Sequence, residues 1–192
     1  MYFSATILQS IGFSQPTLAS LGVSGTNFAF TVAALLLIDR VGRRRMLVYS
    51  IPAMILSLLL AAYGFSRIAP SSTDDGTDRT AAAGVVLASM MLYVAAYAIG
   101  LGNVPWMQSE LFPLSVRALG SGVATATNWA ANFVVGLTFL PLMDALGPPW
   151  TFVLYACVCT AGYGLVVAIY PETAGLSLEE TTAVLATGWG VR

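Results

Sequence analysis

Long apolar stretches without a charged residue dominate the chain. There are five, and the first is long enough for more than one membrane pass: residues 1–38, 46–66, 80–109, 118–143 and 145–171. A helix crosses the hydrocarbon core of a bilayer with about 20 apolar residues. The first stretch is interrupted at residues 12–16 by a turn-like cluster, in which Pro16 suits the first turn of a new helix. The pattern therefore predicts a protein that crosses a membrane several times.

We expect an all-α membrane protein with one partial and five complete spanning helices. The bundle occupies residues 1–171, and a cytoplasmic tail follows over residues 172–192. The first eleven residues cover only about half of the hydrocarbon core, because a helix rises about 1.5 Å per residue. The upstream part of that helix is therefore expected to be missing. The spans are expected at residues 1–11 (partial), 17–38, 46–66, 82–107, 118–143 and 149–170.

Composition agrees with a membrane protein and removes several other classes. Hydrophobic residues make up 57% of the chain and charged residues only 9%, whereas soluble domains carry about 25% charged residues. The eight basic residues are all arginine and the net charge is -1, so the chain lacks an electrostatic footprint for nucleic acid. Histidine is absent, which removes the usual general base and the commonest metal ligand. We expect no enzymatic activity, no cofactor and no metal.

The arginines are distributed unevenly between the two sides of the predicted bundle. If the spans alternate in direction, six of them fall on one side: Arg40, Arg43, Arg44, Arg45, Arg117 and Arg192. The other side holds only Arg67 and Arg79. Cytoplasmic loops carry the excess of positive charge, so the arginine-rich side and the carboxyl terminus are predicted to be cytoplasmic. The polar segment between Arg67 and Arg79 is predicted to be an external connector.

Three charged motifs follow the second, fourth and sixth predicted helices, all on the predicted cytoplasmic side. They are Asp39-Arg40-Val41-Gly42-Arg43-Arg44-Arg45, Glu110-Leu111-Phe112-Pro113-Leu114-Ser115-Val116-Arg117 and Pro171-Glu172-Thr173-Ala174-Gly175-Leu176-Ser177-Leu178-Glu179-Glu180. This order of motifs resembles the later half of the sugar porter family of the major facilitator superfamily. The resemblance implies the carboxyl-terminal six-helix bundle of such a transporter, with its first helix truncated.

Two further segments narrow the resemblance. Residues 100–113 and 124–129 look like the fungal myo-inositol/proton symporters, in which a tryptophan and a glutamate stand four apart, as Trp106 and Glu110 do here. The resemblance implies secondary transport of a neutral polyol or sugar by alternating access, with myo-inositol favoured over a hexose and with proton coupling. It also implies a multi-pass protein of the plasma membrane rather than of the vacuolar membrane.

Polar side chains within the spans are the candidates for binding the substrate, because an amide in hydrocarbon must find a partner or line a wet cavity. The resemblance assigns these residues to the central cavity: Tyr2, Asn27, Trp106, Asn128, Trp129 and Asn132. Amides donate to and accept from hydroxyls, and an indole face packs against the C–H face of a six-membered ring. The alternatives are contacts between helices for the asparagines and anchoring at the lipid interface for the tryptophans.

The charged motifs are expected to form a cytoplasmic gate, since arginine offers paired donors to carboxylates. The resemblance assigns these residues to it: Asp39, Arg40, Arg43, Arg44, Glu110, Arg117 and Glu172. A topological anchor is the alternative. Gly100, Gly102 and Pro105 interrupt the fourth span and predict a hinge, with a static kink as the alternative.

The expected partners follow from the resemblance and from the part of the family pattern that is missing. The family's segment with several sugar-binding amides and its coupling carboxylate both fall before the start of this chain. A complete transporter of this type needs two halves. We therefore expect a polyol or sugar substrate, protons, the lipid membrane and an amino-terminal half as partners. The alternative hypothesis is a truncated, non-transporting half that regulates or binds a complete transporter.

Overall fold

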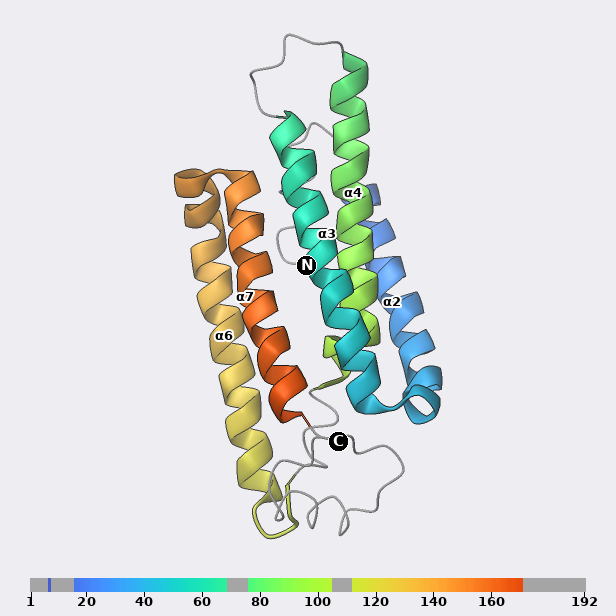
Figure 1. Ribbon diagram of the computed structural model, residues 1–192, viewed down its shortest axis with the longest axis vertical. Helices are drawn as coiled ribbons and strands as arrows, with labels where there is room; N and C mark the ends of the chain where they lie inside the picture. Colours follow the sequence, from blue (N-terminus) through green and yellow to red (C-terminus); the bar gives the residue numbers. More distant parts are fainter. Residues whose placement is uncertain (1–6, 8–15, 69–75, 105–111, 171–192) are drawn as a thin grey trace.

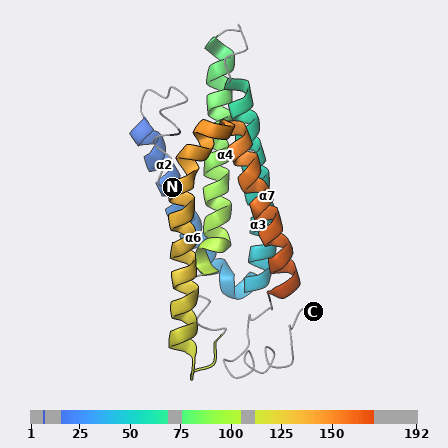
Figure 2. The same ribbon diagram turned by 90° about the vertical axis from the view of Figure 1, so that its left-hand side faces the viewer.

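The computed structural model describes residue 7 and residues 16–68, 76–104 and 112–170. These residues are almost all helical and include no strand, which confirms the predicted all-α class. Five α-helices are long and apolar enough to cross a membrane, and they run along the long axis of the molecule (Figures 1 and 2). The elements are α2 (Pro16–Val41), α3 (Arg43–Ile68), α4 (Gly76–Ile99), the 3-10 turn η1 (Leu101–Asn103), α6 (Arg117–Leu146) and α7 (Pro148–Ile169).

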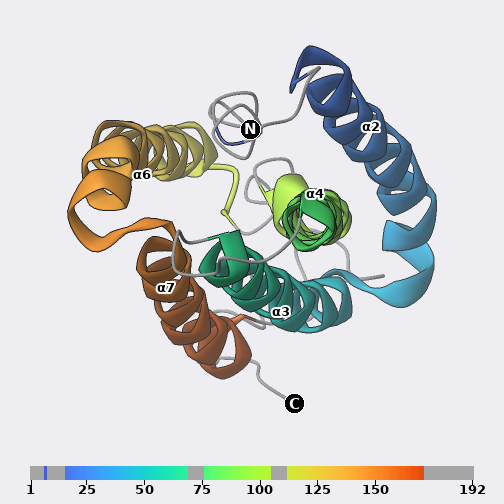
Figure 3. The same ribbon diagram turned by 90° about the horizontal axis from the view of Figure 1, so that it is seen from above.

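Helices α3 and α4 form the centre of the described bundle. Helix α3 packs against α4 and against α7, while α2 packs mainly on α4 and α6 mainly on α7. Seen from above, α4 therefore lies between α2 and α3, and α2 and α6 lie on opposite sides of the bundle (Figure 3).

The contact between α3 and α4 is close because small residues line it. A Cβ atom added to Gly64 of α3 would lie 2.7 Å from the Cγ2 atom of Val86 in α4, and Val86 is completely buried. Ser57 and Ala61 of α3 are buried as well. Small residues let helix backbones approach closely, which strengthens the van der Waals contact that drives helix association in lipid.

An aromatic cluster joins α3, α6 and α7 at the end of the bundle opposite the arginine-rich turn. The rings of Phe65 and Phe152 stack with centroids 5.2 Å apart, and Phe139 meets Phe152 edge-on at 6.3 Å. Ile7, the described residue of the first predicted span, belongs to the same buried cluster. The cluster therefore brings residues from both ends of the sequence together.

The turn between α6 and α7 is held by a buried hydroxyl. Thr151 is fully buried, and its Oγ1 donates to the carbonyls of Leu142 at 3.1 Å and Gly147 at 3.0 Å. Gly147 has φ of +80°, a conformation that side chains with a Cβ rarely adopt. The two helices thus form a pinned antiparallel hairpin.

The helix ends differ from the expected spans. Helices α2, α3 and α6 extend beyond 17–38, 46–66 and 118–143 and take in flanking arginines. The expected span 82–107 differs most, because α4 begins earlier, at Gly76, and its α-helical part ends at Ile99. A charge-free stretch marks only the apolar part of a helix, whereas the hydrogen-bonded helix continues into the charged residues at its ends. This explains why α2, α3 and α6 are longer than the expected spans.

Candidate functional site

A stripe of polar side chains runs along one face of α6. Ser121, Thr125, Asn128 and Asn132 follow one another at spacings of four, three and four residues. At about 100° of turn per residue, all four lie within about 40° of the direction of Phe139. We call these four residues the polar stripe. Asn128 and Asn132 are candidates from the sequence, whereas Ser121 and Thr125 are added by the structure, although the helical period alone indicates them.

The burial of Phe139 shows which way this face turns. Phe139 is the one buried side chain of α6, and it lies in the aromatic cluster with Phe152 and Ile7. The same face, continued toward the start of α6, carries the polar stripe. The polar stripe therefore lies on the side of α6 that turns toward the bundle.

The two asparagines of the polar stripe differ in their contacts. The Nδ2 atom of Asn132 donates to the carbonyl of Asn128 at 2.9 Å, within the helix. Asn128 is exposed, and its amide has no hydrogen-bond partner within the described part of the chain. The Asn128 amide can therefore both donate to and accept from a hydroxyl-bearing ligand.

Trp129 and Asn27 are placed less centrally. The Trp129 side chain is 60% exposed and points about 100° away from Asn128 around α6, so it flanks the polar stripe. Asn27 is half-buried and shares a face of α2 with the buried residues Val23 and Ala34. Because α2 packs mainly on α4, this position favours a contact between helices for Asn27, the alternative interpretation of that residue.

The fourth predicted span is broken where its glycines lie. After Ile99 the chain leaves the α-helix, with φ of -106° and ψ of -87° at Gly100, and continues through the turn η1. Asn103, 4% exposed, donates from Nδ2 to the carbonyls of Ala98 and Ile99, each at 3.0 Å. The Asn103 amide thus caps the carbonyls that the break releases. This role of Asn103 was not predicted from the sequence.

The break also lies against α3. A Cβ atom added to Gly100 would overlap the side chain of Ser50, lying 2.5 Å from its Cβ atom and closer still to its Oγ. A Cβ atom on Gly102 would meet the carbonyl of Tyr97 at 3.1 Å. Gly100 therefore stands where there is no room for a side chain, and Gly102 stands where a Cβ atom would be tightly packed. Their movement stays a prediction.

The predicted gate lies partly within the described residues. Four helix ends lie toward the lower end in Figure 1: the end of α2, the starts of α3 and α6, and the end of α7. The Nη2 atom of Arg44 donates to the carbonyl of Val167 at 3.1 Å, which ties the start of α3 to the end of α7. The Nε atom of Arg117 donates to the carbonyl of Phe112 at 3.3 Å. Arg44 thus places a cation at the carbonyl end of α7, where the helix dipole favours a positive charge.

Several predicted residues lie outside the described part of the chain. Those are Tyr2, Pro105, Trp106, Glu110 and Glu172, together with the side chain of Asp39. Their assignments to the cavity, the hinge and the gate stay predictions.

The glycine of the arginine-rich turn has a specific conformational role. Gly42 separates α2 from α3, has φ of +94° and is buried. We expect Gly42→Ala to lower the free energy of unfolding by about 1–2 kcal/mol, because a Cβ atom is strained at this φ. An SDS titration of the purified full chain in mixed micelles measures the change. Gly25→Ala within α2, where nothing lies within 4 Å of an added Cβ, is the control and should not destabilise. Equal effects of both would contradict the interpretation.

Comparison with known proteins places this arrangement in a family. The family model described as "Sugar (and other) transporter" matches residues 1–185. Myo-inositol transporter 1 of Cryptococcus neoformans is 44% identical over 196 residues, covering 100% of this chain and 35% of the relative. Myo-inositol transporter 2 of Schizosaccharomyces pombe is 43% identical, covering 98% and 33% respectively. The chain thus spans about a third of the length of these relatives.

Solved structures of a bacterial sugar transporter have the same fold. A double-tryptophan mutant of XylE matches with a TM-score of 0.81 and 29% identity, covering 95% of this chain and 38% of that one. The inward-open xylose transporter XylE from Escherichia coli matches with a TM-score of 0.73 and 28% identity, covering 95% and 40%.

The comparisons confirm the predicted fold class, a helical bundle of the major facilitator type, and the predicted membrane protein. The relatives are named as transporters, which confirms the prediction that the chain is not an enzyme. The match over residues 1–185 includes the described helices that carry the polar stripe and the arginine-rich turn. The chain therefore belongs to the sugar (and other) transporter family of the major facilitator superfamily.

Proposed function

We propose that the chain forms the carboxyl-terminal half of a transporter that moves a neutral polyol or sugar across a membrane by alternating access. The observation that carries the proposal is the polar stripe of α6, continuous with the inward-facing Phe139. The names of the relatives favour myo-inositol over a hexose.

The chemistry of the polar stripe suits an uncharged, hydroxyl-rich substrate. An amide and hydroxyls offer both donors and acceptors without adding a charge. Among the described side chains, Asp144 is the acidic one, and it lies near the end of α6. The described part of the chain therefore supplies no carboxylate at mid-membrane depth. If transport is coupled to protons, the coupling carboxylate belongs to the other half of the protein.

The basic end of the bundle supports the gate as part of this proposal. Arg44 links α3 to the carbonyl end of α7, so a change in the angle between these helices has to break or stretch that hydrogen bond. Glu110 and Glu172 are the proposed carboxylate partners of the gate arginines. Such a contact, made in one state and lost in the other, biases an equilibrium between two conformations. The positive-inside rule puts this end in the cytoplasm, and we propose the plasma membrane as the location.

The proposal is tested by uptake of labelled myo-inositol and glucose into cells that lack their own transporters for both. The chain is expressed alone and together with a separately expressed amino-terminal half from the Schizosaccharomyces pombe relative. We expect uptake of myo-inositol only when both halves are present. Absence of uptake in both arms, despite membrane expression of both halves, would overturn the proposal and favour a regulatory or binding role.

A substitution in the polar stripe should abolish most of this uptake. We expect Asn128→Leu to lower the initial rate by about tenfold or more, because a buried substrate hydroxyl then loses its partner. Thr127→Val is the matched control, since Thr127 lies at the same depth, faces about 100° away and bonds to the Val123 carbonyl of its own helix. The control should stay within about twofold of the unmodified chain. Equal losses in both variants would remove the polar stripe from the site.

A further inference from the structure

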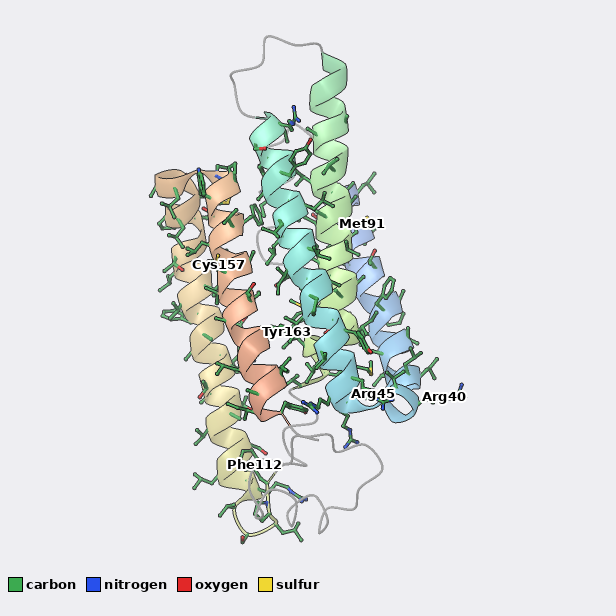
Figure 4. The ribbon with its side chains drawn as sticks, viewed as in Figure 1. Arg40, Arg45, Met91, Phe112, Cys157 and Tyr163 are labelled. Atoms are coloured by element: carbon green, nitrogen blue, oxygen red, sulfur yellow. The ribbon has the colours of Figure 1, made fainter. Side chains whose placement is uncertain are left out.

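The four arginines of the turn between α2 and α3 divide into two pairs. Arg43 and Arg44 are half-buried, and Arg44 bonds to α7. Arg40 and Arg45 are exposed, and neither takes part in an ion pair or hydrogen bond within the described part of the chain. Figure 4 shows Arg40 on the side of the bundle away from α7, and Arg45 at the start of α3. Within the described part of the chain, the outer pair therefore has no partner and can bind an anion from outside the bundle.

Exposed apolar side chains lie one helical turn from each of these arginines, on the membrane side. Leu36 precedes Arg40 by four residues and is 70% exposed, and Tyr49 follows Arg45 by four residues and is 75% exposed. Residues four apart share a helix face. Both helices thus present the same order at this end, an apolar or aromatic group toward the hydrocarbon and a guanidinium beyond it.

This order matches the depth profile of a phospholipid. Aromatic rings favour the level of the headgroups, and a long cationic side chain reaches outward from the apolar region. The apolar candidate span of α2 ends at Ile38, two residues before Arg40. Arg45 lies within the first turn of α3, where a cation is disfavoured by the helix dipole and gains from a neighbouring anion.

We propose that Arg40 and Arg45, each one helical turn beyond an exposed apolar or aromatic side chain of its own helix, bind the phosphate and headgroup carboxylate groups of anionic phospholipids at this end of the bundle. Guanidinium pairs with phosphate and carboxylate oxygens through two parallel hydrogen bonds, which favours an anionic lipid over a zwitterionic one. The site is separate from the polar stripe and does not depend on the proposed transport.

The opposite end of α3 offers a natural control. Arg67 also follows an exposed tyrosine by four residues, but its guanidinium lies over the Tyr63 ring, 5.2 Å from the centroid. Arg67 is thus partly engaged by its own helix. Removing its charge changes the net charge of the chain as much as removing Arg40 or Arg45.

The test uses the purified full chain with mixed phosphatidylcholine and phosphatidylserine, and native mass spectrometry to measure bound lipid. We expect Arg40→Gln and Arg45→Gln each to weaken phosphatidylserine binding about fivefold and the double variant about 25-fold, since each basic residue near a membrane surface adds a comparable increment. Arg67→Gln should stay within about twofold, and phosphatidylcholine binding should not change in any variant. Circular dichroism checks that the helix content is retained.

Three results would overturn the proposal. The double variant could retain phosphatidylserine as well as the unmodified chain does, or Arg67→Gln could weaken binding equally, which would indicate net charge alone. Excess inorganic phosphate could also displace the lipid completely, which would indicate a plain anion site rather than one built for a phospholipid. We expect inorganic phosphate to compete weakly, because it cannot use Leu36 and Tyr49.

Discussion

The substitution Gly100→Ala is expected to lower the free energy of unfolding of the full chain by about 3 kcal/mol. The added methyl group would overlap Ser50 of α3, and Met46 limits any retreat because its carbonyl lies 3.4 Å from the new atom. Ser50 is buried and bonds to the Leu47 carbonyl at 3.2 Å, so it cannot swing into solvent. Either α4 must move away from α3 or the break must shift along the chain.

Two further variants separate this overlap from a general effect of losing a glycine. Gly84 lies within the preceding helix α4, where nothing is within 4 Å of an added Cβ, so we expect no loss of stability from Gly84→Ala. Ser50→Gly removes the atoms that the new methyl group meets, so the double variant should recover most of the loss. An SDS titration in mixed micelles gives all four free energies for a double-mutant cycle. Strict additivity of the two substitutions would contradict the proposed contact.

The second large effect is expected at Asn103. Replacing Asn103 by alanine should cost about 2–3 kcal/mol, because the carbonyls of Ala98 and Ile99 lose the amide that satisfies them in a buried position. Asn132→Ala is the matched control, since it also removes a bond from an asparagine amide to a backbone carbonyl but does so on an exposed face. We expect that control to cost less than about 1 kcal/mol, measured in the same titration.

The outcome at Asn103 also reports on the break itself. If Asn103→Ala is as stable as the unmodified chain, the two carbonyls must have found other donors, and the cap would not hold the break in place. A loss of stability with unchanged helix content would instead show that the break persists and is merely less well satisfied. Comparing the titration with circular dichroism distinguishes these results.

Much of the fold could be predicted from the sequence, because lipid forces a simple pattern on it. Backbone groups in hydrocarbon must be satisfied within the segment, so charge-free stretches of this length become helices. The predicted helix ends were less accurate, because the arginines at residues 43–45 belong to α3 although they are charged. The interruption near Gly100 was visible in the sequence, but the capping by Asn103 depends on the backbone geometry of the break, which brings its amide to the carbonyls of Ala98 and Ile99.

The candidate site was predictable to a similar degree. Asn128 and Asn132 stand out as amides in an apolar helix, and the structure adds the direction in which they face, through Phe139. Asn27 looks the same in the sequence, yet its face of α2 also carries the buried residues Val23 and Ala34. The arginines of the turn likewise appear equivalent in the sequence. Their division into inner and outer pairs arises from the packing of α3 on α7, which local patterns do not encode.

The pinned hairpin of α6 and α7 has a mechanical consequence. Helix α6 is 30 residues long and is held near its upper end by Thr151 and Phe139, with α7 as its main neighbour. Helix α6 can therefore tilt about this fixed end. Asn128 lies about 21 Å and Arg117 about 37 Å from the clamped end at Leu142. A tilt of about 5° would displace Asn128 by about 2 Å and Arg117 by about 3 Å. A small tilt of α6 could thus weaken the contact between Asn128 and a small solute while moving Arg117 further still.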